Sequence, residues 1–335
     1  MWKSTRTRPR ALRAAGLGLP LAALAGIGYS ALLVPHKMEL PPALPGDRRE
    51  LAGRAGRLSY YAAGTSGAPL LLVHSINAAA SAYEVRPLFE YYSKTRRVYA
   101  LDLPGFGFSD RSDREYSPRL YADATLDMVD EIKRDAGAEA VDALALSLGC
   151  EFLARAASEH PERFSSLALV SPTGMRKDDQ LYGSPGSVRG FAAIKSFWEF
   201  PLWSQAVFDL LNSRQSQRYF LAKTFGSAEA VDQGLLEYDY LTAHQPGAQH
   251  APFAFVSGLL FSADITRVYE SLEMPVWVSH GVRGDFTDYG GVQRLAGRTN
   301  WSVQVFQTGG IPYFEQPTEF TAAYDAFLQK TEQRV

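Results

Sequence analysis

Several short runs of the chain are continuously apolar, and this feature constrains the fold more than any other. Two of them are Leu-Leu-Leu-Val at 70–73 and Leu-Ala-Leu-Val at 167–170. A strand with one face in solvent alternates apolar and polar residues, whereas a strand that is buried on both faces does not. Such strands occur in parallel sheets with helices packed on each side. We therefore predict an α/β protein with a mostly parallel sheet.

The expected strands alternate with amphipathic stretches that predict helices, among them 120–134 and 151–160. Strands are expected at 58–62, 69–74, 97–101, 141–146, 167–171, 276–280 and 303–307. Roughly 100 residues separate the last two of these from the others, far more than an ordinary connection needs. Residues 191–261 contain 14 aromatic side chains in 71 positions, against 12% for the whole chain. This insertion predicts a helical cap whose inner face lines an apolar pocket.

The first 34 residues combine a basic leader with a long uncharged stretch. The leader contains no acid and five basic residues, Lys3, Arg6, Arg8, Arg10 and Arg13. Residues 14–34 would span roughly 30 Å as a helix, the thickness of a hydrocarbon core. We expect an uncleaved anchor, with the domain on the non-cytoplasmic side by the positive-inside rule. The alternatives are a cleaved signal followed by secretion, a transit peptide, and a buried helix.

These features suggest a division of the chain into five parts. They are a leader and anchor or signal at 1–34, a proline-rich tether at 35–56, a core at 57–175, the cap at 176–269 and the rest of the core at 270–335. Beyond residue 34 there are 29 basic and 36 acidic residues, which argues against a nucleic-acid partner. The single cysteine, Cys150, cannot form an internal disulfide or a zinc site by itself. We expect neither a cofactor nor a metal.

The segment Ala-Leu-Ser-Leu-Gly at 145–149 carries the strongest chemical signal. A buried strand ends there, and a helix is expected to begin at once. In such a turn Ser147 would present its hydroxyl at the top of the sheet, as a nucleophile does. The start of the helix would favour a developing oxyanion beside it. A serine that merely caps the helix is the alternative interpretation.

Five segments in register resemble the α/β-hydrolase fold superfamily, of the capped serine hydrolase type, from Leu58 onward. They are the serine turn itself, Val-His-Ser-Ile-Asn at 73–77, Asp-Leu-Pro-Gly-Phe-Gly-Phe-Ser at 102–109, the strand at 275–281 and the segment 309–320. The resemblance implies an oxyanion hole formed by the backbone N–H groups of Leu148 and Ile76. Asn77 would add a side-chain donor or cap the next helix.

The last segment departs from the family pattern at its catalytic position, because the expected histidine is replaced by Gly310. Glycine cannot accept a proton, so the usual Ser–His–acid relay cannot form there. Among the other histidines, His280 is our first candidate for a substitute base, since it ends a strand at the catalytic edge. A buried structural histidine is the alternative. The resemblance places the triad acid at Asp285, with Asp288 as a second choice.

Two functions follow from these residues. The first is a membrane-tethered hydrolase, of esterase or lipase type, that acts on a hydrophobic ester or acyl substrate through Ser147. The second is a catalytically silent relative that binds an apolar ligand or a partner, because Gly310 replaces the base. A lyase or an acyl transferase on the same scaffold is not separated from these by sequence.

Overall fold

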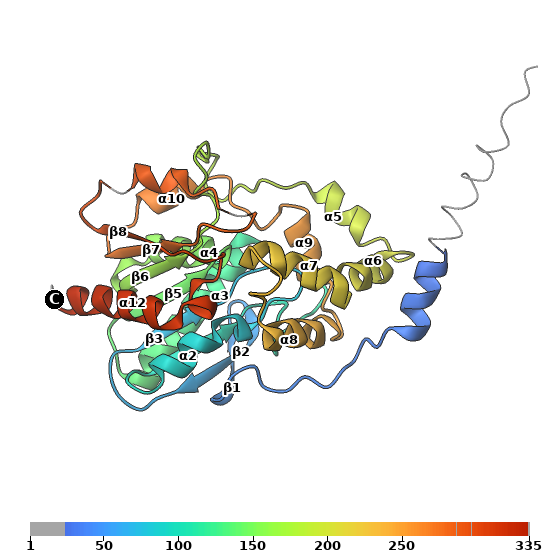
Figure 1. Cartoon of the computed structure of the whole chain (residues 1–335), viewed down its shortest axis with the longest axis horizontal. Helices are drawn as coiled ribbons and strands as arrows, with labels where there is room; N and C mark the ends of the chain where they lie inside the picture. The colour runs from blue at the N-terminus through green and yellow to red at the C-terminus, as the bar shows by residue number, and fades with distance from the viewer. Residues whose placement is uncertain (1–23, 286, 296, 334–335) are drawn as a thin grey trace, which may run out of the picture.

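The computed structural model describes residues 24–285, 287–295 and 297–333. Its centre is an eight-stranded sheet in the order β1-β2-β4-β3-β5-β6-β7-β8 (Figure 1). The strands are β1 (Asp47–Gly53), β2 (Gly56–Ala63), β3 (Leu70–Val73), β4 (Val98–Asp102), β5 (Val141–Leu146), β6 (Phe164–Val170), β7 (Val276–His280) and β8 (Trp301–Val305). The pairs β1–β2 and β2–β4 are antiparallel, and the other five pairs are parallel. The predicted mostly parallel α/β sheet is therefore confirmed.

Helices cover the sheet and fill the insertion. They are α2 (Arg86–Tyr92), α3 (Pro118–Ala136), α4 (Gly149–Glu159), α5 (Ala192–Trp198), α6 (Ser204–Leu211), α7 (Arg214–Phe225), α8 (Gln233–Ala243), α9 (His250–Val256), α10 (Ile265–Glu270), α11 (Pro312–Glu315) and α12 (Pro317–Glu332), with short 3₁₀ turns η1 (Ala82–Val85), η2 (Pro161–Arg163) and η3 (Gly290–Arg294). Local sequence explains the bounds of α3. The Ser117 hydroxyl accepts from the Leu120 N–H, Pro118 occupies the first turn, and Gly137 ends the helix at φ 65°.

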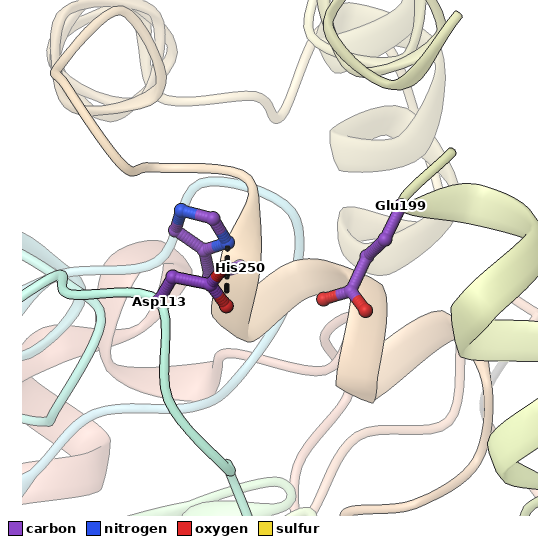
Figure 2. Close-up of side chains that lie close together, drawn as sticks. All are labelled: Asp113, Glu199 and His250. Atoms are coloured by element: carbon purple, nitrogen blue, oxygen red, sulfur yellow. Dashed lines mark ion pairs between the residues drawn. The ribbon is translucent and has the colours of Figure 1, made fainter. Parts of the chain in front are cut away.

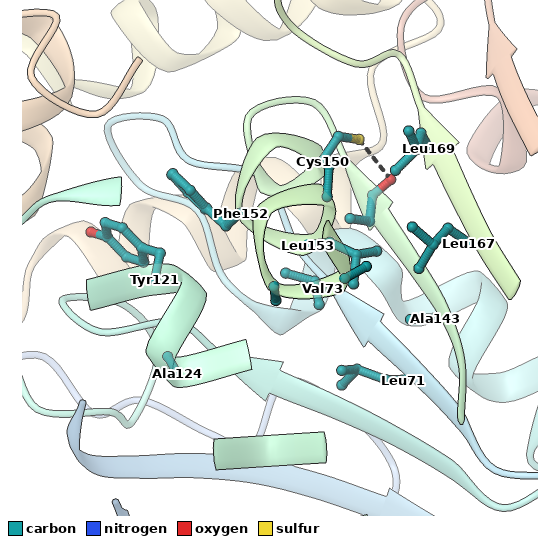
Figure 3. Close-up of a cluster of buried hydrophobic side chains, with 14 of the residues drawn as sticks. Leu71, Val73, Tyr121, Ala124, Ala143, Cys150, Phe152, Leu153, Leu167 and Leu169 are labelled. Atoms are coloured by element: carbon teal, nitrogen blue, oxygen red, sulfur yellow. Dashed lines mark hydrogen bonds between the residues drawn. The ribbon is translucent and has the colours of Figure 1, made fainter. Parts of the chain in front are cut away.

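The central strands bury both faces, which explains their continuous apolar runs. In β3, Leu71 and Val73 pack in the cluster that includes α3 and α4 (Figure 3). Their neighbours Leu70 and Leu72 pack in the second cluster, with α2 and α12. Successive side chains of a strand point to opposite faces, so both faces must be apolar when helices cover each.

The segment 35–56, interpreted as a tether, is bound to the domain. The Tyr238 hydroxyl donates to the Pro41 carbonyl oxygen at 2.8 Å, and the Ala43 N–H donates to the Tyr61 hydroxyl at 2.9 Å. Residues 47–53 form β1, which pairs antiparallel with β2. Within the segment predicted as a tether, residues 47–53 are therefore part of the sheet. The prolines of this segment all precede β1, so they remove no hydrogen bond from its ladder.

The predicted anchor at 14–34 lies partly outside the described residues. Residues 24–33 are helical. Among the residues that the structure describes, no helix is both long enough and apolar enough to span a bilayer.

The helical insertion packs on loops at the carboxyl edge of the sheet. Near the end of α7, the Thr224 carbonyl oxygen accepts from the Gly310 N–H at 2.7 Å, and the Lys223 carbonyl oxygen accepts from the Asp285 N–H at 3.1 Å. These loops follow β8 and β7, and the turn after β5 lies at the same edge. By contrast α10, within the range expected for the cap, packs against α4.

Candidate active site

Ser147 lies in a strained turn between β5 and α4. Its φ of 52° is in the left-handed region, which only one other non-glycine residue, Ser171, adopts among the described residues. The Ser147 N–H donates to the Val170 carbonyl oxygen at 2.8 Å, which ties the turn to β6. A Cβ atom on Gly149 would come within 2.4 Å of the His74 carbonyl oxygen, so this position needs glycine. Strained serine and obligatory glycine together are typical of a nucleophile turn.

The predicted oxyanion donors are buried beside this turn. Leu148 is 1% exposed and directly precedes α4, and Ile76 is 3% exposed in the loop after β3. Within the described part of the chain, neither backbone N–H donates a hydrogen bond. Buried N–H groups are almost always paired, so two unpaired donors beside a nucleophile suit an oxyanion.

Asn77 does not cap the next helix, because the N-cap of η1 is Ser81, whose hydroxyl accepts from the Tyr83 N–H. Asn77 Oδ1 accepts from the Ala79 N–H at 2.7 Å, and its Nδ2 donates to Glu84 Oε1 at 2.7 Å. The side chain is therefore held by the protein itself. The expectation that it adds a donor to the oxyanion hole has no support in these contacts.

Glu84 is a buried acid that the sequence analysis missed. Its carboxylate accepts from the Ser75 N–H at 2.7 Å and from the Ser75 hydroxyl at 2.9 Å. Burial raises the pKa of Glu84 to about 7, although these hydrogen bonds oppose the shift. A second acid, Asp239 of α8, is also buried, and burial and the charge of Glu84 raise its pKa well above the ordinary value. No motif marks either residue, because only the packing of α8 on η1 brings them near one another.

The position of the family histidine is open. The Gly310 carbonyl oxygen accepts from the Ser171 hydroxyl at 2.7 Å. A Cβ atom on Gly310 would meet only Thr224, with its nearest atoms at 3.4 and 3.5 Å, an ordinary contact. The loop therefore leaves room for a Cβ atom at position 310, but no imidazole of the described residues is hydrogen-bonded to Ser147.

His280, our candidate for a substitute base, is held by its own loop. Its Nδ1 lies 2.9 Å from the Gly281 carbonyl oxygen, and its ring stacks on Tyr289 with the centroids 4.3 Å apart. Burial lowers the pKa of His280. These contacts give it a structural role without assigning it a catalytic one.

Within the described residues, neither predicted acid is hydrogen-bonded to a histidine. Asp285 is ion-paired with Lys223 of the cap. Asp288 Oδ1 accepts from the Lys177 N–H at 3.1 Å and from the Gly290 N–H at 3.2 Å. Exposed loop carboxylates pair with the nearest cation or N–H when no imidazole is presented to them.

His74 is a structural residue. Its Nδ1 lies 2.5 Å from the Ser75 carbonyl oxygen, and its Nε2 accepts from the Leu103 N–H at 3.0 Å. Burial lowers the pKa of His74 to about 4, so the ring is neutral near pH 7. Its role is to join the loop after β3 to the loop after β4.

Three potential metal ligands meet where the cap touches the core (Figure 2). The ligand atoms of Asp113, Glu199 and His250 all lie within 4.8 Å of one another. His250 Nδ1 is 3.6 Å from Asp113, and Lys195 Nζ is 2.5 Å from Glu199. Lys195 therefore neutralises Glu199, and Asp113 and His250 border a cavity of about 520 Å³. We interpret the cluster as a polar contact between cap and core.

The sheet order, the strained serine turn and the helical insertion define the class of protein. Residues 68–253 match the family described as "alpha/beta hydrolase fold". The chain belongs to the α/β hydrolase fold family.

Curated relatives include 2-hydroxymuconate semialdehyde hydrolase of Pseudomonas sp. (strain CF600), which is 29% identical over 41% of this chain and 48% of its own length. The chain thus matches about half the length of this relative. Solved structures with the same fold include a meta-cleavage product hydrolase from Pseudomonas fluorescens IP01, with a TM-score of 0.64 and 21% identity, covering 84% of this chain and 97% of that one. A membrane phospholipase A has a TM-score of 0.64 and 19% identity, and covers 96% of each chain.

Proposed function

We propose that this protein is a serine hydrolase that cleaves a hydrophobic ester or acyl substrate, with Ser147 as its nucleophile. The observation that carries the proposal is the strained φ of 52° at Ser147. Strain of this kind costs of order 1–3 kcal/mol and persists where function requires the geometry. A serine that only capped α4 would need no such strain, and the N-cap residue of α4 is Leu148 rather than Ser147.

Two groups are candidates for the base. His280 is the residue expected from the sequence, and a neutral imidazole can accept a proton. Glu84 has a pKa of about 7, in the range suited to proton transfer near neutral pH, and its carboxylate contacts Ser75 and Asn77 rather than Ser147. Ser75, which binds Glu84, is in the loop that carries the oxyanion donor Ile76.

An apolar substrate is supported by the aromatic cap. The relatives support hydrolysis of small molecules, since their names include a semialdehyde hydrolase and, among the solved structures, a thermophilic esterase from Thermogutta terrifontis. A lyase or acyl transferase remains the competing chemistry, and one curated relative from Cupriavidus necator is named as an acetyltransferase component.

We further propose that residues 14–34 hold the protein at a membrane, with the domain on the non-cytoplasmic side. The uncharged stretch behind five basic residues supports this. A carbonate wash of membranes tests it, since an integral anchor resists the wash. Recovery of a mature chain that begins near residue 35 would favour secretion after signal cleavage instead.

The decisive experiment for the active site is labelling with a fluorophosphonate, combined with turnover of a panel of p-nitrophenyl esters. We expect labelling and turnover in the wild type, and neither in Ser147→Ala. Loss of turnover in His280→Ala or in Glu84→Gln, with labelling slowed in parallel, identifies the base. If the wild type neither labels nor turns over any ester, the hydrolase proposal fails.

That failure would favour a second function, binding of an apolar ligand or partner without catalysis. Two observations support it specifically. Gly310 provides no base, and Asp285 is paired with Lys223 instead of an imidazole. A silent relative would bind a fluorescent fatty acid equally well as wild type and as Ser147→Ala.

A further inference from the structure

Large apolar side chains are exposed mainly on two neighbouring segments of the chain. Of the seventeen that are exposed in the described residues, twelve lie in residues 24–33 and 191–220. They are Leu24, Tyr29, Leu32, Leu33, Phe191, Ile194, Phe197, Phe200, Leu202, Leu210, Tyr219 and Phe220, and we call them the cap face. Isolated exposed apolar residues are normal, but a concentration of this size marks a surface that is covered in use.

Hydrogen bonds join the two segments to each other. The Ser30 hydroxyl donates to Asp209 Oδ2 of α6 at 2.5 Å, and His36 Nε2 lies 2.9 Å from the same oxygen. In Figure 1 the helix at residues 24–33, α5 and α6 lie at the same end of the molecule, opposite the C-terminus. The rings of Phe200 and Trp203 are 4.5 Å apart, so the aromatic residues also contact one another.

The cap face carries almost no free charge over residues 24–33 and 191–212, whereas its α7 part adds Arg214, which is paired with Glu237, and Arg218. Residues 191–212 contain only Lys195, Glu199 and Asp209 as charged residues. Lys195 is paired with Glu199 at 2.5 Å, and Asp209 is bound by Ser30 and His36. A surface without unpaired charge can enter an apolar medium at a low desolvation cost.

The face also reaches the proposed active site. Tyr219 and Phe220 are on α7, and the Phe220 carbonyl oxygen accepts from the Thr224 hydroxyl at 3.1 Å. Thr224 is the residue that contacts Gly310. A partner seated on the cap face would therefore lie one helical turn from the catalytic edge.

We infer that the cap face docks on a lipid bilayer, with its aromatic side chains in the interfacial region, so that an apolar substrate enters from the lipid. The sequence that leads into residue 24 supports a bilayer as the occupant, because residues 14–23 are uncharged and five basic residues precede them. Amphipathic surfaces with aromatic residues favour the membrane interface, and basic residues favour anionic lipid. The entry of substrate from the lipid rests on the proposed function, whereas the contact between the cap face and the bilayer does not.

Quenching of Trp203 tests the contact in the full chain. Protein is mixed with phosphatidylcholine vesicles that contain phosphatidylglycerol and brominated acyl chains, which quench only tryptophans within the bilayer. The difference between wild type and Trp203→Phe isolates Trp203 from the other four tryptophans. We expect Trp203 to be quenched, and Phe197→Glu to reduce this quenching at least twofold. The matched control is Val305→Glu, since Val305 is 44% exposed on β8 away from the face.

A second measurement connects the contact to turnover. We expect Phe197→Glu to lower hydrolysis of an ester embedded in vesicles about 10-fold while leaving hydrolysis of a soluble p-nitrophenyl ester unchanged. Membrane attachment that resists carbonate without quenching of Trp203 would overturn the docking and leave the anchor intact. Quenching that survives Ser147→Ala supports docking even if catalysis fails. If Phe197→Glu instead converts a dimer to a monomer and Trp203 is not quenched, the face is a protein interface and the inference is wrong.

Discussion

Restoring a histidine at position 310 should increase esterase turnover. In the resemblance to capped serine hydrolases this position carries the base, and here it is glycine. The structure permits the change, because an added Cβ atom lies 3.4 Å from the Thr224 carbonyl oxygen and 3.5 Å from its Cγ2. Gly310 is not among the residues with positive φ, so a side chain causes no backbone strain. We therefore expect Gly310→His to fold.

The expected gain is about 10²-fold in kcat, at the low end of the range of about 10²–10⁴ for a positioned general base. The low end is expected because Asp285 is paired with Lys223, and an imidazole without an oriented acid is a weaker base. Adding Lys223→Met to Gly310→His should release Asp285 and increase turnover further, by about 10-fold.

The assay is hydrolysis of p-nitrophenyl butyrate at about pH 8, where a histidine is neutral at its ordinary pKa. Gly310→Gln is the matched control, since it adds similar bulk but no base. Gly309→Ala is a second control, for substitutions that the loop does not tolerate. Its Cβ atom would lie only 2.4 Å from the Phe225 backbone and must disturb the fold. If Gly310→His melts like the wild type but reacts no faster than Gly310→Gln, then position 310 does not face Ser147 and our reasoning is wrong.

Three further predictions concern buried groups. Burial raises the pKa of Glu84 from its ordinary value of 4.5 to about 7. Between these two pH values the folded chain keeps a proton on Glu84 that the unfolded chain has released. The free energy of unfolding should therefore fall by roughly 3 kcal/mol as the pH rises from about 4.5 to about 7. Urea unfolding at about pH 4.5 and 7.5 should show a smaller fall in Glu84→Gln; an identical fall would contradict the pKa. Arg155→Met should lower the free energy of unfolding by about 3–5 kcal/mol in the same assay. In the wild type Arg155 Nη2 lies 2.5 Å from Asp264 Oδ1, and the substitution leaves this buried carboxylate without its ion-pair partner. Cys150 should not react with a maleimide until the chain unfolds, since it is fully buried and burial raises the pKa of its thiol; labelling of the native protein would refute this.

The sheet could be predicted from local sequence because its signal is local. A strand buried on both faces has no polar position, and this makes 70–73 and 167–170 recognisable without a structure. The bounds of β5 and β7 are as predicted, at Val141–Leu146 and Val276–His280. The edge of the sheet was less predictable. β1 was missed because its residues are largely exposed, so that no apolar pattern marks them.

Within the site, the serine turn and its glycine were readable because steric demands act on neighbours in the chain. The amino-acid sequence by itself therefore determined the parallel sheet, the turn at Ser147 and the missing histidine at Gly310. Only the tertiary structure decided the partners of these groups. Glu84 binds Ser75, Asp285 pairs with Lys223 and the cap meets Gly310 through Thr224. The physical reason is that burial, pKa and ion pairing depend on residues far away in the chain, whereas strand and turn geometry depends on adjacent ones.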